Sequence, residues 1–89
     1  MKILITAKDQ NTFEVIVTTV STTTHIVTVS DTIHDKLTDG KISKETLLEK
    51  SFEFLLEREP NTSILLQFEI EVISKYFPDY ENVVSNWLK

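Results

Sequence analysis

Histidines and carboxylates are the side chains in this sequence best suited to chemistry. His25 and His34 are its only histidines, and Asp31 and Asp35 lie close to His34 in the chain. A histidine beside carboxylates could hold a metal ion or move protons near neutral pH. A metal site needs several convergent ligands, however, and the Asp31–His34 spacing is ordinary for a helix surface. We therefore expect no metal site.

Glutamates at four-residue spacing form a second candidate. Glu45, Glu49 and Glu53 would share one face of a helix, where an acid–base array is conceivable. The same stripe is expected on the solvent side of any helix whose other face is apolar, and Lys44 and Lys50 lie nearby to relieve repulsion. We interpret the stripe as a solvated surface.

Covalent chemistry has little support in the sequence. There is no cysteine, and the single glycine cannot build a glycine-rich loop around a phosphate. No serine lies in a nucleophile elbow, and no nucleotide, flavin or nicotinamide motif is present. We expect neither an enzyme nor a bound cofactor; a small hydrolase that uses His25 or His34 is the remotest alternative.

Charge and hydropathy restrict the partners. The net charge is −5, and the whole excess lies in residues 31–89, with seven basic residues against twelve acidic ones. An acidic surface repels nucleic-acid phosphates and anionic membranes. No apolar run approaches the roughly 20 residues that cross a bilayer. These features, and the absence of disulfides, predict a cytoplasmic protein that does not bind nucleic acid or membranes.

The elements that must position these side chains change type near residue 30. Residues 2–6, 12–19 and 24–29 are rich in β-branched residues, and the second run alternates apolar and polar side chains. Short polar loops between them predict adjacent antiparallel strands. Residues 1–30 should therefore form a sheet.

Residues 31–89 have helical character. A short helix is expected over 31–39, capped by Ser30 or Asp31, and Gly40 suits the left-handed position after it. Two longer helices are expected near 44–58 and 63–77, separated by Pro60, and a weaker, shorter one within 78–89. Ser43 is the cap expected for the first of the two.

Together these elements predict one α+β domain over residues 1–89. It should contain a small antiparallel β-meander of two to three strands, with two to four helices packed on one face. In the helix expected over 63–77, the predicted core side chains are Leu65, Phe68 and Val72.

The helical half contains more apolar side chains than one buried face accounts for. Phe52 and Phe54, for example, lie about 200° apart around a helix. Either both sides are covered or a patch is exposed, and exposed apolar patches usually mark interfaces. The side chains out of phase with the main stripes are our candidate interface for a protein partner or a second copy in a homodimer: Phe54, Leu56, Leu66, Ile70 and Tyr80.

Two resemblances add to this interpretation. Residues 24–57, "THIVTVSDTIHDKLTDGKISKETLLEKSFEFLLE", resemble a ribbon-helix-helix unit. The resemblance implies an intertwined dimer whose strand reads the DNA major groove, here with Thr24, Ile26 and Thr28 or with the alternate set His25, Val27 and Val29. Two strands precede this ribbon, its first helix is short, and no basic residue flanks it.

Residues 37–80, from "LTDGKISK" to "YFPDY", also resemble small bacterial proteins of uncharacterised function, which implies a cytoplasmic bacterial protein and no particular site. The leading hypothesis is a non-enzymatic protein–protein interaction module or small regulatory subunit. The alternative is a DNA-binding regulator of the ribbon-helix-helix kind.

Overall fold

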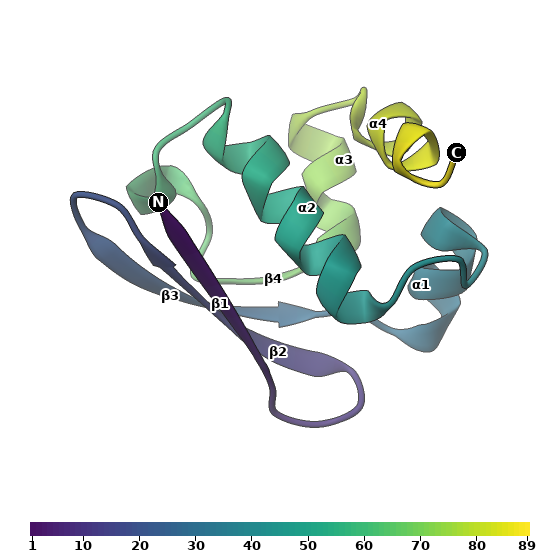
Figure 1. Cartoon of the computed structure of the whole chain (residues 1–89), viewed down its shortest axis with the longest axis horizontal. Coiled ribbons are helices and arrows are strands. Elements are labelled where there is room, and N and C mark those ends of the chain that lie inside the picture. The colour runs from purple at the N-terminus through teal and green to yellow at the C-terminus, as the bar shows by residue number, and fades with distance from the viewer.

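The computed structural model describes residues 1–89 and contains a four-stranded sheet with its helices on one face (Figure 1). The strands follow one another across the sheet in chain order, β1-β2-β3-β4. The first three pair antiparallel, and the fourth is parallel to β3. The strands are β1 (Lys2–Ala7), β2 (Thr12–Thr18), β3 (Thr22–Thr28) and β4 (Gln67–Glu69).

The alternation of side chains decides which face of the sheet is covered. In β2 the side chains of Phe13, Val15 and Val17 are buried, whereas the residues between them are not. β3 continues the pattern, and Val27 lies opposite Phe13 in the register. The predicted α+β class and the β2–β3 antiparallel pair are confirmed. The mixed sheet, with its parallel fourth strand, is not the simple meander that was expected.

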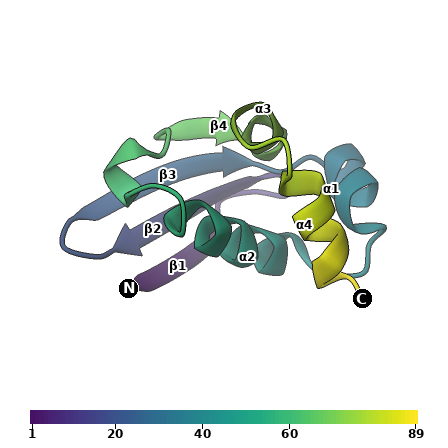
Figure 2. The same ribbon diagram turned by 90° about the horizontal axis from the view of Figure 1, so that it is seen from above.

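The helices and turns that cover this face come from residues 31–87 (Figure 2). α2 crosses above β1 and β2, α3 lies behind it on the β4 side, and α4 packs toward α1 and α3. None of these helices is long and apolar enough to cross a bilayer. They are α1 (Asp31–Thr38), α2 (Lys44–Leu56), α3 (Ile73–Tyr76) and α4 (Tyr80–Trp87), with 3-10 turns η1 (Asn61–Ser63) and η2 (Ile70–Val72).

Local capping explains where α1 and α2 begin and where α1 ends. The Ser30 hydroxyl accepts from the Ile33 N–H, and the Ser43 hydroxyl accepts from the Thr46 N–H. After α1 the backbone is left-handed at two successive residues, Asp39 with φ 53° and Gly40 with φ 70°. The caps and the positive φ of Gly40 are therefore confirmed.

The helix predicted over residues 63–77 is wrong. The segment instead contains η1, β4, η2 and the single-turn α3. Ile64 already has extended angles, and the Ile26 N–H of β3 donates to the Leu66 carbonyl at 2.8 Å. Pairing with the open side of β3 satisfies backbone groups on both strands, and this long-range gain outweighs the helical spacing of the apolar residues.

The core contains fifteen buried apolar residues, and three predicted interface residues are among them. Phe54, Ile70 and Tyr80 are almost wholly buried, so their assignment to an exposed interface is wrong. The Phe54 ring lies 5.5 Å from the Tyr80 ring, centre to centre, because α4 covers that side of α2. Conversely, Leu65 was expected in the core and is 45% exposed, while Phe68 and Val72 are only half-buried.

Candidate binding groove

An apolar groove opens where the end of α2, η1, β4 and α3 meet. Its volume is about 170 Å³, and eight of its ten lining residues are hydrophobic. We call it the Leu65 groove. It is lined by Leu55, Glu59, Ser63, Ile64, Leu65, Phe68, Val72, Ile73, Tyr76 and Phe77.

The irregular backbone of residues 61–76 keeps this groove open. Because extended, 3-10 and helical residues follow one another, the apolar side chains do not form one continuous stripe. Leu65 and Tyr76 line the groove yet stay 45% and 66% exposed, and the neighbouring Leu66 is also exposed. These are three of the six large hydrophobic residues exposed in the whole chain, and clustering of this kind marks a contact surface.

Glu59 supplies the one carboxyl group of the groove. Partial burial raises the pKa of its carboxyl group above the ordinary value, because desolvation penalises the charged form. None of the four ion pairs in the protein includes Glu59. The adjacent Arg58 does not pair with Glu59. Its guanidinium contacts Asp79 at 3.3 Å and stacks over the Phe54 ring at 3.6 Å. A cationic group brought into the groove would therefore find an unpaired carboxylate.

Buried hydrogen bonds hold one wall of the groove in place. A carbonyl oxygen only accepts, so His25 Nδ1 donates to the Leu65 carbonyl at 2.8 Å, and His25 Nε2 then accepts from the Thr23 hydroxyl at 2.7 Å. Thr23 in turn accepts from the side-chain amide of Asn61 at 3.0 Å. His25 and Asn61 are both buried, and through them β3 fixes the positions of η1 and Leu65.

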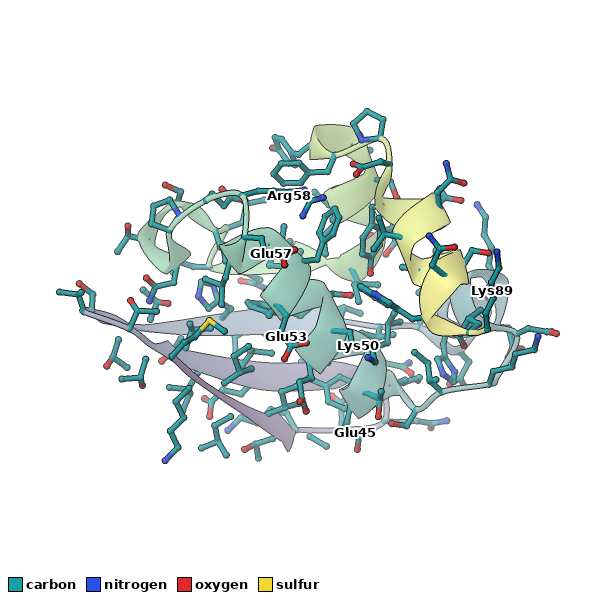
Figure 3. The ribbon with its side chains drawn as sticks, turned by 45° about the horizontal axis from the view of Figure 1, so that its top comes forward. Glu45, Lys50, Glu53, Glu57, Arg58 and Lys89 are labelled. Atoms are coloured by element: carbon teal, nitrogen blue, oxygen red, sulfur yellow. The ribbon has the colours of Figure 1, made fainter.

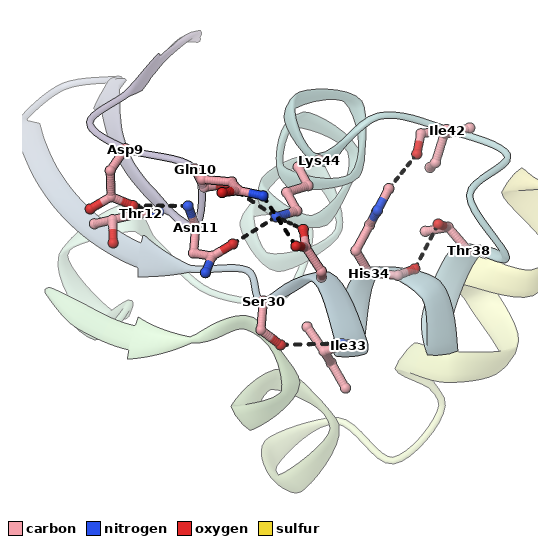
Figure 4. Close-up of polar contacts among 11 residues, drawn as sticks. Asp9, Gln10, Asn11, Thr12, Ser30, Ile33, His34, Thr38, Ile42 and Lys44 are labelled. Atoms are coloured by element: carbon pink, nitrogen blue, oxygen red, sulfur yellow. Dashed lines mark hydrogen bonds and ion pairs between the residues drawn. The ribbon is translucent and has the colours of Figure 1, made fainter.

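Among the other candidate chemical groups, His34 and Asp31 have structural partners (Figure 4). His34 Nε2 donates to the Ile42 carbonyl at 2.6 Å, which ties α1 to the loop before α2. Lys44 Nζ donates to Asp31 at 2.7 Å and also to the β1–β2 loop. The Lys44 ammonium, through its hydrogen bond and its charge, lowers the pKa of Asp31. No three histidine, aspartate or glutamate side chains converge as metal ligands.

Comparison with known proteins gives no further guide. No family model, curated protein or solved structure matches this chain. The chemistry of the groove therefore has to be inferred from its own residues.

Two of the five predicted interface residues retain some exposure. Leu66 is 64% exposed and does not line the Leu65 groove, and Leu56 is half-buried against the core. The sequence reasoning missed Leu65, Tyr76 and Phe77 as groove residues. The predicted helix over 63–77 would place Leu65 in the core. The groove would have been indicated only by a prediction of extended backbone before β4.

The DNA-reading strand that the ribbon-helix-helix hypothesis implies does not fit this sheet. β3 lies between β2 and β4 and is paired on both sides, so it has no free edge for the strand of a partner. His25, Val27 and Val29 are buried under the helices. Only Thr24, Ile26 and Thr28 face the open side of the sheet, and no basic residue lies beside them in β3.

Proposed function

We propose that this protein is a non-enzymatic interaction module, and that the Leu65 groove binds one apolar anchor side chain of a protein partner. The observation that carries the proposal is the coincidence of an apolar groove with the exposed side chains of Leu65 and Tyr76 in its lining. Burying exposed apolar groups of this kind is the usual source of affinity in protein complexes.

The size of the groove favours a side chain over a metabolite. Pockets for drug-sized ligands measure roughly 300–1,000 Å³. The Leu65 groove has about 170 Å³, which is closer to the space that a single large apolar side chain fills. Apart from the Tyr76 hydroxyl, its lining offers only two polar side chains, Glu59 and Ser63, too few to orient a polar substrate.

The charge of the groove specifies the partner further. Glu59 has no internal cation, and the protein carries a net charge of −5. A basic residue next to the apolar anchor would pair with this carboxylate and be attracted by the field of the whole molecule. The partner we propose is therefore a segment with a bulky apolar residue flanked by lysine or arginine.

Selection from a library of random displayed peptides tests this function. Wild-type protein should enrich peptides with an apolar anchor beside a basic residue. The double variant Leu65→Ser, Tyr76→Ser should bind the enriched peptides at least about tenfold more weakly, because the anchor loses its apolar walls. Val20→Ser is the matched control, since Val20 is fully exposed on the β2–β3 hairpin and does not line the groove.

Two results would overturn the proposal. Equal affinity of the double variant and the wild type for the enriched peptides would place their binding outside the groove. Sedimentation equilibrium provides the second test: a wild-type dimer that the double variant converts to a folded monomer would show that the groove binds a second copy of the chain. Circular dichroism of both variants checks that they remain folded.

A further inference from the structure

We propose that the free edge of β1 binds an extended basic segment of a partner protein, which pairs with it as a fifth strand. This surface lies at the opposite side of the sheet from β4 and the Leu65 groove, so it is a second contact and does not depend on the first. The inference rests on the backbone of β1, on its side chains, and on the charge of the helix above it.

The hydrogen-bond pattern identifies the backbone groups that are free. The Lys8 N–H donates to the Thr12 carbonyl at 2.8 Å, which closes the β1–β2 hairpin. In an antiparallel pair the backbone groups of successive residues point alternately toward and away from the partner strand. Lys2, Leu4 and Thr6 therefore face β2. The N–H and C=O groups that face outward belong to Ile3, Ile5 and Ala7.

Between Lys2, its first residue, and Lys8, just beyond its end, this edge lacks the usual protection against strand pairing. Natural edge strands carry inward charges, prolines or bulges, or lie under a loop. From Ile3 to Ala7 there is neither a charge nor a proline, and the register with β2 runs without a bulge. Ile3 and Ile5 are only half-buried although they point to the helix face. A further strand would cover them and pair the three outward residues.

The helix above β1 determines the chemistry of that strand. α2 contacts β1 and lies over it, and Glu45 and Glu53 project from the exposed side of α2 (Figure 3). Glu49 lies between them at helical spacing, and all three side chains are exposed and outside every ion pair. Lysine or arginine at alternate positions of an added strand would cover Ile3 and Ile5 with the methylene stem and reach these carboxylates with the charged end.

The same charges argue against a second copy of the chain as the occupant. Pairing β1 with β1 of another copy would bring the two α2 helices to one seam, with a row of three glutamates on each. Like charges brought together in this way destabilise the pair. The complementary occupant is a strand with basic side chains toward α2 and with apolar or threonine side chains toward Leu4 and Ile16 on the open face.

The test uses a synthetic peptide that alternates lysine with threonine, which offers no apolar anchor to the Leu65 groove, and a scrambled peptide in which the lysines are contiguous. Titration into isotope-labelled protein should protect the amides of Ile3, Ile5 and Ala7 from hydrogen exchange. The triple variant Glu45→Gln, Glu49→Gln, Glu53→Gln should weaken binding by about tenfold, and added salt should act in the same direction. The Leu65→Ser, Tyr76→Ser variant should bind this peptide as wild type does, which separates this surface from the groove.

Backbone pairing has its own control, which leaves the protein unchanged. Methylation of alternate backbone nitrogens on the edge-facing side of the peptide removes the donors needed for pairing and should abolish binding. Equal binding of the alternating, scrambled and methylated peptides would reduce the effect to general charge attraction and overturn the proposal. Unchanged exchange at Ile3, Ile5 and Ala7 would overturn it as well. So would a wild-type protein that sediments as a dimer paired through β1.

Discussion

Helix α2 and the segment Asn61–Tyr76 are both rich in apolar residues, yet they use them in opposite ways. α2 buries two neighbouring rows of its side chains: Leu47, Leu48, Ser51, Phe52, Phe54 and Leu55. The segment Asn61–Tyr76 leaves Leu65, Leu66 and Tyr76 exposed around a groove. Apolar content alone therefore does not distinguish a core element from a contact surface.

Backbone regularity makes the difference. α2 begins at a serine cap and continues for thirteen residues, so its apolar residues repeat on one side and meet the sheet, α3 and α4 together. The segment Asn61–Tyr76 changes conformation every three or four residues, and each change redirects the next side chain. A regular element can bury its stripe completely, whereas an irregular one leaves side chains that only a partner can cover.

The largest expected effect is the loss of a core ring from α2. Phe52 is fully buried and packs against His25 and Phe68, with ring centres 5.4 Å and 6.2 Å away. Phe52→Ala should lower the free energy of unfolding by about 3–5 kcal/mol, as truncation of a buried phenylalanine does. Chemical denaturation followed by circular dichroism measures the change.

Phe68→Ala is the matched variant from the second segment. Phe68 is only half-buried and lines the groove, so its truncation should cost clearly less than that of Phe52. Equal losses for the two variants would contradict the distinction between a closed core at α2 and an open surface at β4.

The next largest effect concerns the polar anchor of the second segment. The Asn61 side-chain amide donates to the carbonyls of Val17 and Ser21 and to the Thr23 hydroxyl. Asn61→Leu keeps the approximate volume and leaves these buried and part-buried acceptors without this donor, which should cost about 1–3 kcal/mol. Hydrogen exchange should rise at residues 61–69 more than in α2. Uniform destabilisation of the whole chain would show that Asn61 does not anchor this segment in particular.

The elements that could be predicted from the sequence are those in which local signals agree. The alternation of Phe13, Val15 and Val17, the serine caps and the single glycine all indicate the same structure that the chain adopts. Pro60 also marks the true end of the α2 region, since α2 stops at Leu56 and η1 follows the proline.

The wrong predictions share one physical cause, which is long-range contact between elements. The helical spacing of apolar residues over 63–77 is a local signal, but the edge of β3 offers long-range hydrogen bonds that no local pattern records. Tyr80 and Phe54 were assigned to a candidate interface, whereas the alternative, cover on both sides of the helix, is what α4 provides. The groove could not be predicted for the same reason: its walls come from five short successive elements between Leu55 and Phe77, and the arrangement of these elements depends on the pairing of β4 with β3.

A smaller effect is expected from the one hydroxyl pair in the core. Tyr80 and Ser51 lie 2.6 Å apart through their hydroxyl oxygens, both buried, and burial raises the pKa of Tyr80. Tyr80→Phe should lower the free energy of unfolding by about 0.5–1.5 kcal/mol, the net value of one neutral hydrogen bond. Tyr76→Phe is the control, because Tyr76 is 66% exposed and should show no loss. A loss at Tyr76 equal to that at Tyr80 would contradict the comparison.

The smallest effect concerns Glu59 and depends on pH. Burial raises the folded-state pKa of Glu59 above its unfolded value, so the ionised carboxylate disfavours folding at neutral pH. Glu59→Gln should therefore melt slightly higher than wild type at neutral pH. The advantage should shrink as the pH falls through the raised pKa, because the wild-type carboxyl group becomes protonated in the folded protein. It should stop changing below the ordinary glutamate pKa of about 4.3, where both states are protonated.

Thermal melts of Glu59→Gln against Glu53→Gln test this expectation, since Glu53 is exposed and outside every ion pair. A Glu59→Gln variant that melts below wild type at neutral pH would reverse the sign and show that the carboxylate stabilises the fold. The same measurement bears on the groove. A basic residue bound beside Glu59 would lower its pKa, so peptide affinity should rise with pH through the titration of Glu59 and lose that dependence in Glu59→Gln.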